Sequence, residues 1–334
     1  MKFSRCLFSF SVGIGLLILP FPVGLRAEIV YAVSFTTGEL IQYDTNSPAS
    51  SRTTVLSGGS LVSPASLALG PDGNLYIGEN GDGSTFAPRI SKYEVDTLTL
   101  STVYAFSSFE IFPASLVFQG NDLLVGRNSF YSNTGAVVKL ENATGGILSI
   151  SDYSVGGALS SSPGLALGSD GKLYVADQSY AFGTGIASGS VKRFNAAGAY
   201  IDELIGDGAS NLAGPTGLVI NGNTLYTASV MNGEILETDL TTDVTSSFAS
   251  TGSPFEAGPM ALVSDGSLLV GSVSGTGSIY HFNSDGSLRA SFASGLGQIG
   301  GVVSGTVIPE PDTVVLLLLG TLLGWRGFCR RKQI

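Results

Sequence analysis

The stretch PASLALGPDGNLYIGE, Pro64–Glu79, shows the pattern on which the fold prediction rests. It contains two short apolar runs on either side of a turn at Asp72 and Gly73. Leu, Ile and Tyr in the runs suit strands, and the Asp-Gly pair suits a tight hairpin, because Gly accepts the positive φ that such a turn needs. The stretch therefore predicts a β-hairpin.

The same pattern recurs along the chain. Segments that start at Pro113, Pro163, Pro215 and Pro259 repeat the order of proline, small residue, apolar run, turn and apolar run. A repeat of about 50 residues built from short strands is typical of a β-propeller, in which each unit is a small sheet that needs neighbours to bury its faces. The alternating strand pattern and the 46 glycines exclude helical repeats.

Each unit continues outward with further apolar runs. Third runs are found at 89–93, 136–140, 190–194, 234–238 and 278–282, and clear fourth runs at 101–105, 246–249 and 290–293. Four short strands in each unit are the composition of a propeller blade.

The first unit lacks an innermost strand. Runs 29–33, 40–43 and 53–56 supply a second, third and fourth strand, whereas Gln298–Val303 stands at the other end of the chain, where a further unit would begin. Pairing of these two ends would close the ring and remove two free sheet edges. We therefore expect residues 28–308 to form an all-β, six-bladed β-propeller with one blade shared between the two ends.

The body of the chain is strongly acidic. Residues 28–309 hold nine basic and 24 acidic residues, a net charge of −15. Binding of nucleic acid needs clustered Lys and Arg to neutralise phosphates, so this class of partner is excluded. Cys6 and Cys329 both lie outside the body, so no disulfide framework is expected in it.

Residues 1–27 have the order of a signal peptide. A basic start at Lys2 and Arg5 precedes an apolar run at 7–19, and the small residue Ala27 suits signal peptidase. The alternative is a membrane anchor, but the run is short of the ~20 residues that span a bilayer. We expect residues 1–27 to be removed on export.

Residues 309–334 contain three elements in a fixed order. Pro309, Glu310 and Pro311 precede a Leu- and Val-rich run, and basic residues that include Arg330 and Arg331 follow it. This order resembles the PEP-CTERM sorting signal of Gram-negative bacteria and cyanobacteria. The resemblance implies a transmembrane segment with a basic tail, removal by the membrane protease exosortase, and an association with exopolysaccharide. It further implies an inner-membrane intermediate and then a cell-surface or extracellular protein.

The repeats resemble the NHL and SMP-30/gluconolactonase group of six-bladed propellers, above all in 163–177 and 190–194. Fold alone does not give function. A lactonase of this group needs oxygen ligands for a divalent metal near the starts of the inner strands, where this chain has Ser66, Ser115, Gly164, Gly217, Ala261 and Gly300. Related lyases need a His near the channel, but His281, the one His of the chain, falls in a third strand.

We therefore expect no catalytic residues and no metal ligands, and a binding or structural module for a polysaccharide or a protein. An SMP-30/gluconolactonase-like or lyase-like enzyme with divergent residues is the alternative. No cofactor is expected. The oxygen donors in Asn80–Ser84 leave Ca²⁺ as a weak option, because the stretch lacks the distal bidentate Glu of a calcium loop and also suits a flexible turn.

The candidate binding site is the channel mouth, on the face where the second strands end. The residues expected there are Glu79, Asn80, Arg127, Asn128, Asp177, Gln178 and Tyr180. Glu79, Arg127 and Asp177 would form a polar rim that binds sugar hydroxyls or a carboxylate. The alternative is that Asp177 caps its own loop and Glu79 forms an ion pair with Arg127 across blades.

Overall fold

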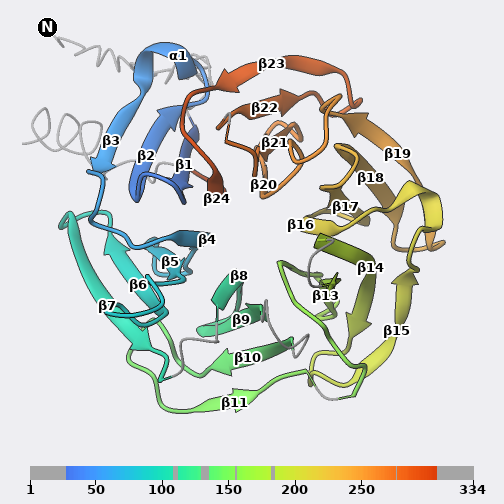
Figure 1. The fold of residues 1–334 in the computed structure, drawn as a ribbon, viewed down its shortest axis with the longest axis horizontal. Coiled ribbons are helices and arrows are strands. Elements are labelled where there is room, and N and C mark those ends of the chain that lie inside the picture. The colour runs from blue at the N-terminus through green and yellow to red at the C-terminus, as the bar shows by residue number, and fades with distance from the viewer. Residues whose placement is uncertain are drawn as a thin grey trace, which may run out of the picture.

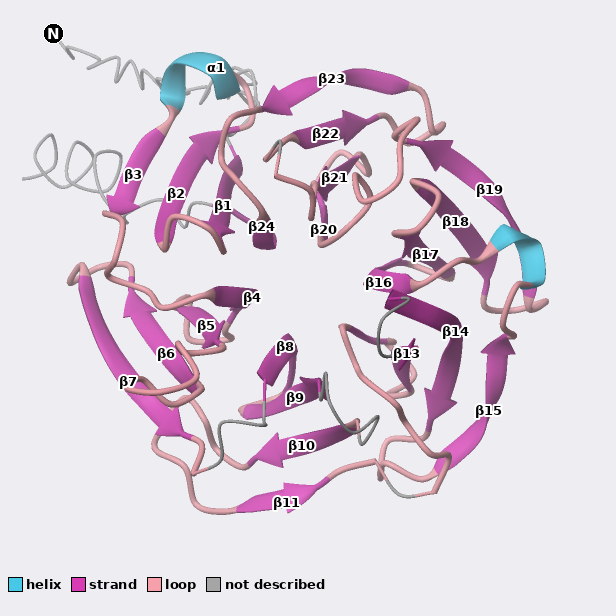
Figure 2. Cartoon of the chain, viewed as in Figure 1, coloured by secondary structure: helices cyan, strands magenta, loops and turns pink. Residues whose placement is uncertain are grey.

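The computed structural model describes residues 28–107, 112–128, 135–154, 156–181, 185–275 and 277–306. In these ranges the chain forms six four-stranded antiparallel sheets arranged around a central channel (Figure 1), so the predicted six-bladed β-propeller is confirmed. Helix in the described ranges is confined to α1 (Pro48–Ser51) and a 3₁₀ turn at Ala209–Asn211 (Figure 2). Neither of these short helices has the length and apolar character to cross a membrane.

The blades are numbered 1–6 in chain order, and the strands of each are counted outward from the channel. The inner strands of blades 1–6 are β24 (Ile299–Thr306), β4 (Pro64–Leu69), β8 (Phe112–Gln119), β12 (Gly164–Leu167), β16 (Pro215–Asn221) and β20 (Met260–Leu262). The second strands are β1 (Glu28–Ser34), β5 (Leu75–Glu79), β9 (Asp122–Asn128), β13 (Leu173–Ala181), β17 (Thr224–Ser229) and β21 (Leu268–Gly271). The third strands are β2 (Glu39–Asp44), β6 (Arg89–Glu94), β10 (Ala136–Leu140), β14 (Gly185–Phe194), β18 (Glu234–Asp239) and β22 (Ile279–Phe282). The outer strands are β3 (Thr53–Leu56), β7 (Thr99–Ala105), β11 (Ile150–Asp152), β15 (Tyr200–Ile205), β19 (Val244–Ser250) and β23 (Leu288–Ala293).

Blade 1 is shared between the two ends of the described chain, as predicted. β24 pairs antiparallel with β1, from Glu28 opposite Thr306 to Ser34 opposite Ile299. Figure 1 shows β24, in dark red, beside β1, in blue. Backbone hydrogen bonds therefore close the ring and leave β1 without a free edge.

Each interface between neighbouring blades encloses a hydrophobic cluster of described residues. In β1, Val30 and Ala32 pack toward blade 6, whereas Tyr31 and Val33 pack toward blade 2, because successive side chains of a strand point to opposite faces. Both faces of the second strands are thus buried, which explains why their runs are apolar throughout.

Tight turns between the inner and second strands define the lower face of the propeller. Gly73, Gly171 and Gly266 occupy these turns with φ of +77°, +80° and +82°, as the Asp-Gly pairs predict. The opposite, upper face carries the starts of the inner strands and the ends of the second strands. The predicted channel mouth is therefore on the upper face.

Two of the predicted segments lie outside the described residues. They are the signal peptide, residues 1–27, and the sorting signal, residues 309–334, with Pro309, Glu310, Pro311, Arg330 and Arg331. Both remain sequence-based predictions.

Candidate functional site

Small residues let the inner strands approach one another around the channel. The Ser66 hydroxyl donates to the Pro113 carbonyl oxygen at 2.6 Å, and the Ser115 hydroxyl donates to the Ser162 carbonyl oxygen at 2.7 Å. Both serines are buried. Each one ties its own blade to the chain that enters the next blade, so these serines have a structural role at the positions where a lactonase would need metal ligands.

Glycine likewise allows a close approach of inner strands in two other blades. A Cβ on Gly164 would overlap the Thr216 carbonyl oxygen, and a Cβ on Gly300 would overlap the Pro64 carbonyl oxygen. The obstructing atoms belong to the backbone of the next blade and cannot turn aside. The channel is therefore formed by strands packed as closely as the backbone allows.

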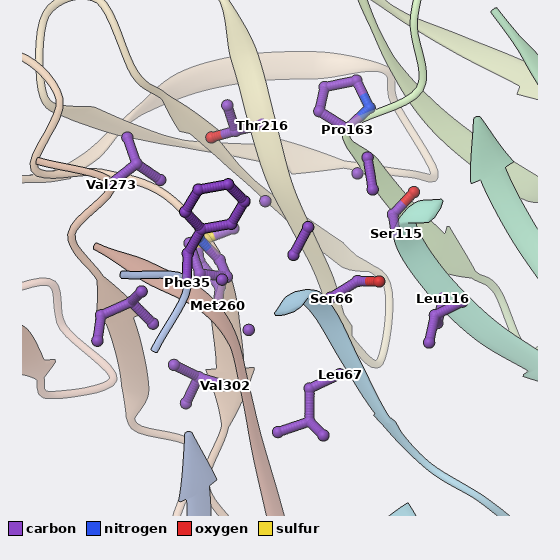
Figure 3. Close-up of a pocket in the computed structure, with 18 of the residues that line it drawn as sticks. Phe35, Ser66, Leu67, Ser115, Leu116, Pro163, Thr216, Met260, Val273 and Val302 are labelled. Atoms are coloured by element: carbon purple, nitrogen blue, oxygen red, sulfur yellow. The ribbon is translucent and has the colours of Figure 1, made fainter. Parts of the chain in front are cut away.

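A cavity of about 270 Å³ lies where the inner strands converge; we call it the central cavity. Figure 3 shows the Phe35 ring projecting among lining residues from the other blades, with Thr216, Val273 and Met260 around it. None of the described lining residues is charged. The polar side chains of the lining are Ser66, Asn80, Ser115, Asn128, Thr216 and Gln298.

Three side-chain amides of the central cavity have unused hydrogen-bonding groups. Asn80 Oδ1 is buried without a partner, and the Asn80 amide bonds to no other described side chain or backbone group. Asn128 Oδ1 accepts from the Ser162 N–H at 3.0 Å, which leaves its Nδ2 free toward the described residues, and the Gln298 amide is likewise unused there. Because buried polar groups are normally paired, side-chain amides without partners in a cavity indicate a site for a polar ligand.

Glu79 lies buried beneath the rim, with 0% of its side chain exposed. Its carboxylate accepts hydrogen bonds from Arg89, from the Ser91 hydroxyl and from the Val62 N–H at 2.7 Å. The bonds to Glu79 raise the pKa of Arg89 above its ordinary value. The predicted pairing of Glu79 with Arg127 across blades is therefore wrong, because Glu79 bonds to Arg89, its register partner on the next strand of the same blade.

Asp177 caps a loop, but it is the loop that leads into β12, whereas the sequence alternative had Asp177 cap its own loop after the second strand. Its Oδ1 accepts from the N–H groups of residues 160–161 at 2.7 and 3.2 Å, and its Oδ2 accepts from Lys192 Nζ at 2.6 Å. The neighbouring Gln178 donates from Nε2 to the Pro215 carbonyl oxygen of blade 5 at 2.7 Å. Both side chains are buried, so they hold the loops of the upper face in place.

Arg127 lies apart from the central cavity. It lines a second hollow of about 270 Å³ between blades 2 and 3, together with Phe106 and Asp152. Within the described ranges no hydrogen bond or ion pair joins its guanidinium to another residue. The backbone of Tyr180 lies in β13, opposite Ile186.

Of the predicted residues, the structure thus brings Asn80 and Asn128 to the central cavity. Phe35, Thr216 and Gln298 complete its polar and aromatic lining. Sequence reasoning missed Thr216 and Gln298 because both lie outside the second strands and their ends. It missed Phe35, which follows β1 as Asn80 follows β5, because only polar side chains were selected at that position. The signal that could have found Gln298 was its place at the start of the closing strand.

Glu256 was also missed, and it supplies in blade 6 the carboxylate that Asp177 supplies in blade 4. It lies in the loop before β20, is buried, and accepts hydrogen bonds from the Ser274 hydroxyl and from the Tyr280 hydroxyl at 3.0 Å. Burial, and then the bond to Glu256, raise the pKa of Tyr280. In blade 4 the acid lies within the second strand β13 and holds the loop that leads into the inner strand. In blade 6 the acid lies in the loop before the inner strand and holds Ser274, which follows the second strand, and Tyr280 of the third strand.

His281 belongs to a buried cluster in blade 6, away from the lining of the central cavity. Ser267 donates its hydroxyl proton to Asp265, so His281 Nε2, 2.7 Å from Ser267 Oγ, must be the donor in that bond. Burial lowers the pKa of His281, Arg289 lowers it further, and Asp265 opposes the shift. The cluster therefore favours the neutral form of the imidazole next to the lower-face turn.

The oxygen-rich stretch Asn80–Ser84 folds as a turn around Asp82. Asp82 Oδ1 accepts the backbone N–H groups of Ser84, Thr85 and Phe86 at 2.9, 2.7 and 2.8 Å. These bonds, that of Phe86 first, hold the pKa of Asp82 below its ordinary value. Among the described residues, no group of three or more His, Cys, Asp or Glu side chains is placed to hold a metal ion.

Comparison with known proteins bears on the fold. The sequence matches no family model and no curated protein. Among the many solved chains that match, one belongs to a structure titled "Crystal structure of Nidogen/Laminin Complex". That chain is 11% identical, with a TM-score of 0.66, and the match covers 84% of this chain and 98% of the other. At this identity the likeness supports the β-propeller fold alone.

Proposed function

We propose that this chain is an exported, exosortase-processed β-propeller that acts at the cell surface or outside the cell as a binding or structural module for a polysaccharide or a protein. Support for export comes from the ordered signals in residues 1–27 and 309–334. Signal peptidase and exosortase are the processing partners, and the membrane holds the C-terminal segment until cleavage. The repeats support a relationship of the body to the NHL and SMP-30 propellers.

The central cavity is the observation that carries the binding role. It lies at the centre of a closed ring, it is mostly apolar, and the free amides of Asn80 and Gln298 converge on it beside the Phe35 ring. A hollow of this kind, apolar with a few placed polar groups, is the usual form of a ligand site.

Filling the cavity tests this proposal. Ala65 lines the cavity, so Ala65→Trp places an indole in it, whereas Ala49→Trp on exposed α1 is the matched control. Retention of the full chain is measured on the polysaccharide and protein fractions of extracellular matrix. Ala65→Trp should weaken retention by at least about tenfold, as for a central contact residue, and Ala49→Trp should leave it unchanged. Equal retention by the two variants would remove the cavity from the binding role.

A further inference from the structure

We infer that the central cavity selects an uncharged, hydroxyl-bearing ring, the terminal or branch sugar of a neutral glycan, and that Asn80 recognises its hydroxyl groups. The inference rests on the proposed binding role of this cavity and names the ligand class. It follows from the charge, the hydrogen-bonding groups and the size of the cavity.

The charge distribution excludes an ionic ligand. No described lining residue is charged. Glu79, which directly precedes Asn80, has its carboxylate fully engaged with Arg89 and with the Val62 N–H, so it cannot serve a bound cation. The body around the cavity carries a net charge of −15, with 24 acids against nine bases, which repels a polyanion such as an acidic polysaccharide.

The hydrogen-bonding groups suit hydroxyls. The Asn80 amide has both an acceptor and donors unused toward the described residues. A hydroxyl is itself one donor and an acceptor, so it can satisfy both sides of a free amide, whereas an anion would use the donors alone. Asn128 adds a free Nδ2 donor, and the Thr216 hydroxyl, which donates to the Ala257 carbonyl oxygen at 3.3 Å, retains its capacity to accept.

The shape and size suit one ring. The volume of about 270 Å³ lies just below the ~300–1,000 Å³ of sites for drug-sized ligands, so the cavity admits a single sugar rather than several linked sugars. Figure 3 shows the Phe35 ring facing this space, where its apolar face can cover the C–H face of a sugar. The Phe35 N–H donates to the Gln298 carbonyl oxygen at 2.8 Å, which fixes the aromatic residue at the rim.

Affinity electrophoresis of the purified full chain tests the inference. Native gels contain a neutral polymer or its charged derivative: dextran or dextran sulfate, and hydroxyethyl cellulose or carboxymethyl cellulose, with galactomannan as a further neutral polymer. Asn80→Ala removes the free amide, and Asn80→Asp keeps its shape but adds a charge. Asn121→Ala, in an exposed turn between β8 and β9, is the matched control. All variants are first compared with the parent by thermal melting.

The inference expects at least one neutral polymer to retard the parent and Asn121→Ala, with the apparent affinity of both Asn80 variants lowered by about tenfold, because a hydroxyl would lose its partner. Stronger, Asn80-dependent binding of a charged derivative overturns the neutral-ligand inference and leaves the binding module standing. The neutral-ligand inference also fails, and the binding module stands, if no polymer binds but the parent retains a matrix protein that Ala65→Trp does not retain. Polymer binding that is unaffected by both Asn80→Ala and Ala65→Trp overturns the inference and the proposed site together.

Discussion

Arg89 binds Glu79 through two parallel hydrogen bonds, from Nε to Oε1 and from Nη2 to Oε2, each 2.8 Å long. Such a two-point contact between guanidinium and carboxylate is among the strong interactions of proteins. Because Glu79 also holds the N–H of Val62, the pair fixes the loop that leads into the inner strand of blade 2. The Glu79 carboxylate, which the sequence suggested as part of a binding rim, therefore has a structural role inside blade 2.

Replacement of Arg89 should destabilise the protein strongly. Arg89→Met leaves the Glu79 carboxylate buried without its cation, which is expected to lower the free energy of unfolding by about 3–5 kcal/mol. Urea unfolding measures the loss. The control is Arg52→Met, since Arg52 meets Glu39 at 3.9 Å and is 46% exposed, so its loss should stay below about 1 kcal/mol. Similar losses in the two variants would show that the Glu79 contact contributes no more than a surface pair.

A methyl group at Gly164 should open the ring of inner strands. Gly164→Ala drives a Cβ into the Thr216 carbonyl oxygen, and overpacking of this kind costs about 1–3 kcal/mol or more. Gly275→Ala is the control, because a Cβ there meets nothing within 4 Å. Thermal unfolding should show a lower melting temperature for the first variant and an unchanged one for the second. A parent-like Gly164→Ala protein would mean that the blades have room to move apart.

Deletion of the closing strand should unfold or aggregate the body. Without residues 298–305, β1 has a free edge, and the burial of Ile299 and Val302 is lost, a term of about 3–6 kcal/mol by itself. The comparison is a chain that ends at residue 306 and keeps β24. Melting temperature and light scattering distinguish the two proteins. Unchanged stability after the internal deletion would argue for an open array of blades.

Stability should fall in mild acid through His281. Its folded-state pKa is lowered by burial, so the unfolded chain, with an ordinary value of about 6.5, takes up the proton first as the pH falls. The contribution of His281 is present above that value and declines until the pH passes the folded pKa. The difference in unfolding free energy between the parent and His281→Gln should therefore be smaller at pH 5 than at pH 8.

Two measurements check this prediction. Paired urea titrations at pH 5 and pH 8 give the difference directly, and a gap independent of pH would contradict it. Since the sequence has a single His, its imidazole signal in NMR follows the folded pKa without assignment. A titration midpoint of His281 at or above the ordinary pKa of His would also contradict the prediction.

Processing should remove both terminal segments. The ordered signals in residues 1–27 and 309–334 lead us to expect an exported protein that begins near Glu28 and ends near Pro309–Pro311. Intact-mass measurement of the exported form checks both boundaries at once. Recovery of residues 313–334 in released protein would refute the sorting prediction.

The architecture could be predicted because it repeats. The Asp-Gly turns, such as Asp72–Gly73, mark where each inner hairpin reverses, and the missing inner strand at one end matches the surplus strand Gln298–Val303 at the other. The outer strand β11 gave no such signal, because its three residues are all exposed and have no alternating pattern. An alternating apolar pattern arises where one face of a strand is buried, and an outer strand such as β11 has little buried surface.

The site was harder to predict, because burial and partner choice depend on neighbours remote in sequence. Asn80 and Asn128 were found because they follow the aligned strand ends, but nothing local distinguishes Asn80, whose amide is free, from Gln178, whose amide binds the Pro215 carbonyl oxygen of the next blade. Glu256 was not predicted because it lies in a loop and not at the strand position where Asp177 of blade 4 lies, although its carboxylate also holds the upper-face segments of its blade. The role of a charged or amide side chain here is decided by the adjoining segment.

The register of blade 1 also fixes the orientation of the propeller. Glu28 lies opposite Thr306 at the lower end of the blade, whereas Phe35 and Gln298 meet at its upper end, beside the central cavity. Both ends of the described body therefore lie on the side remote from the cavity. A tether at either end would hold the protein with its cavity turned outward, and cutting that tether would release the body without altering the site.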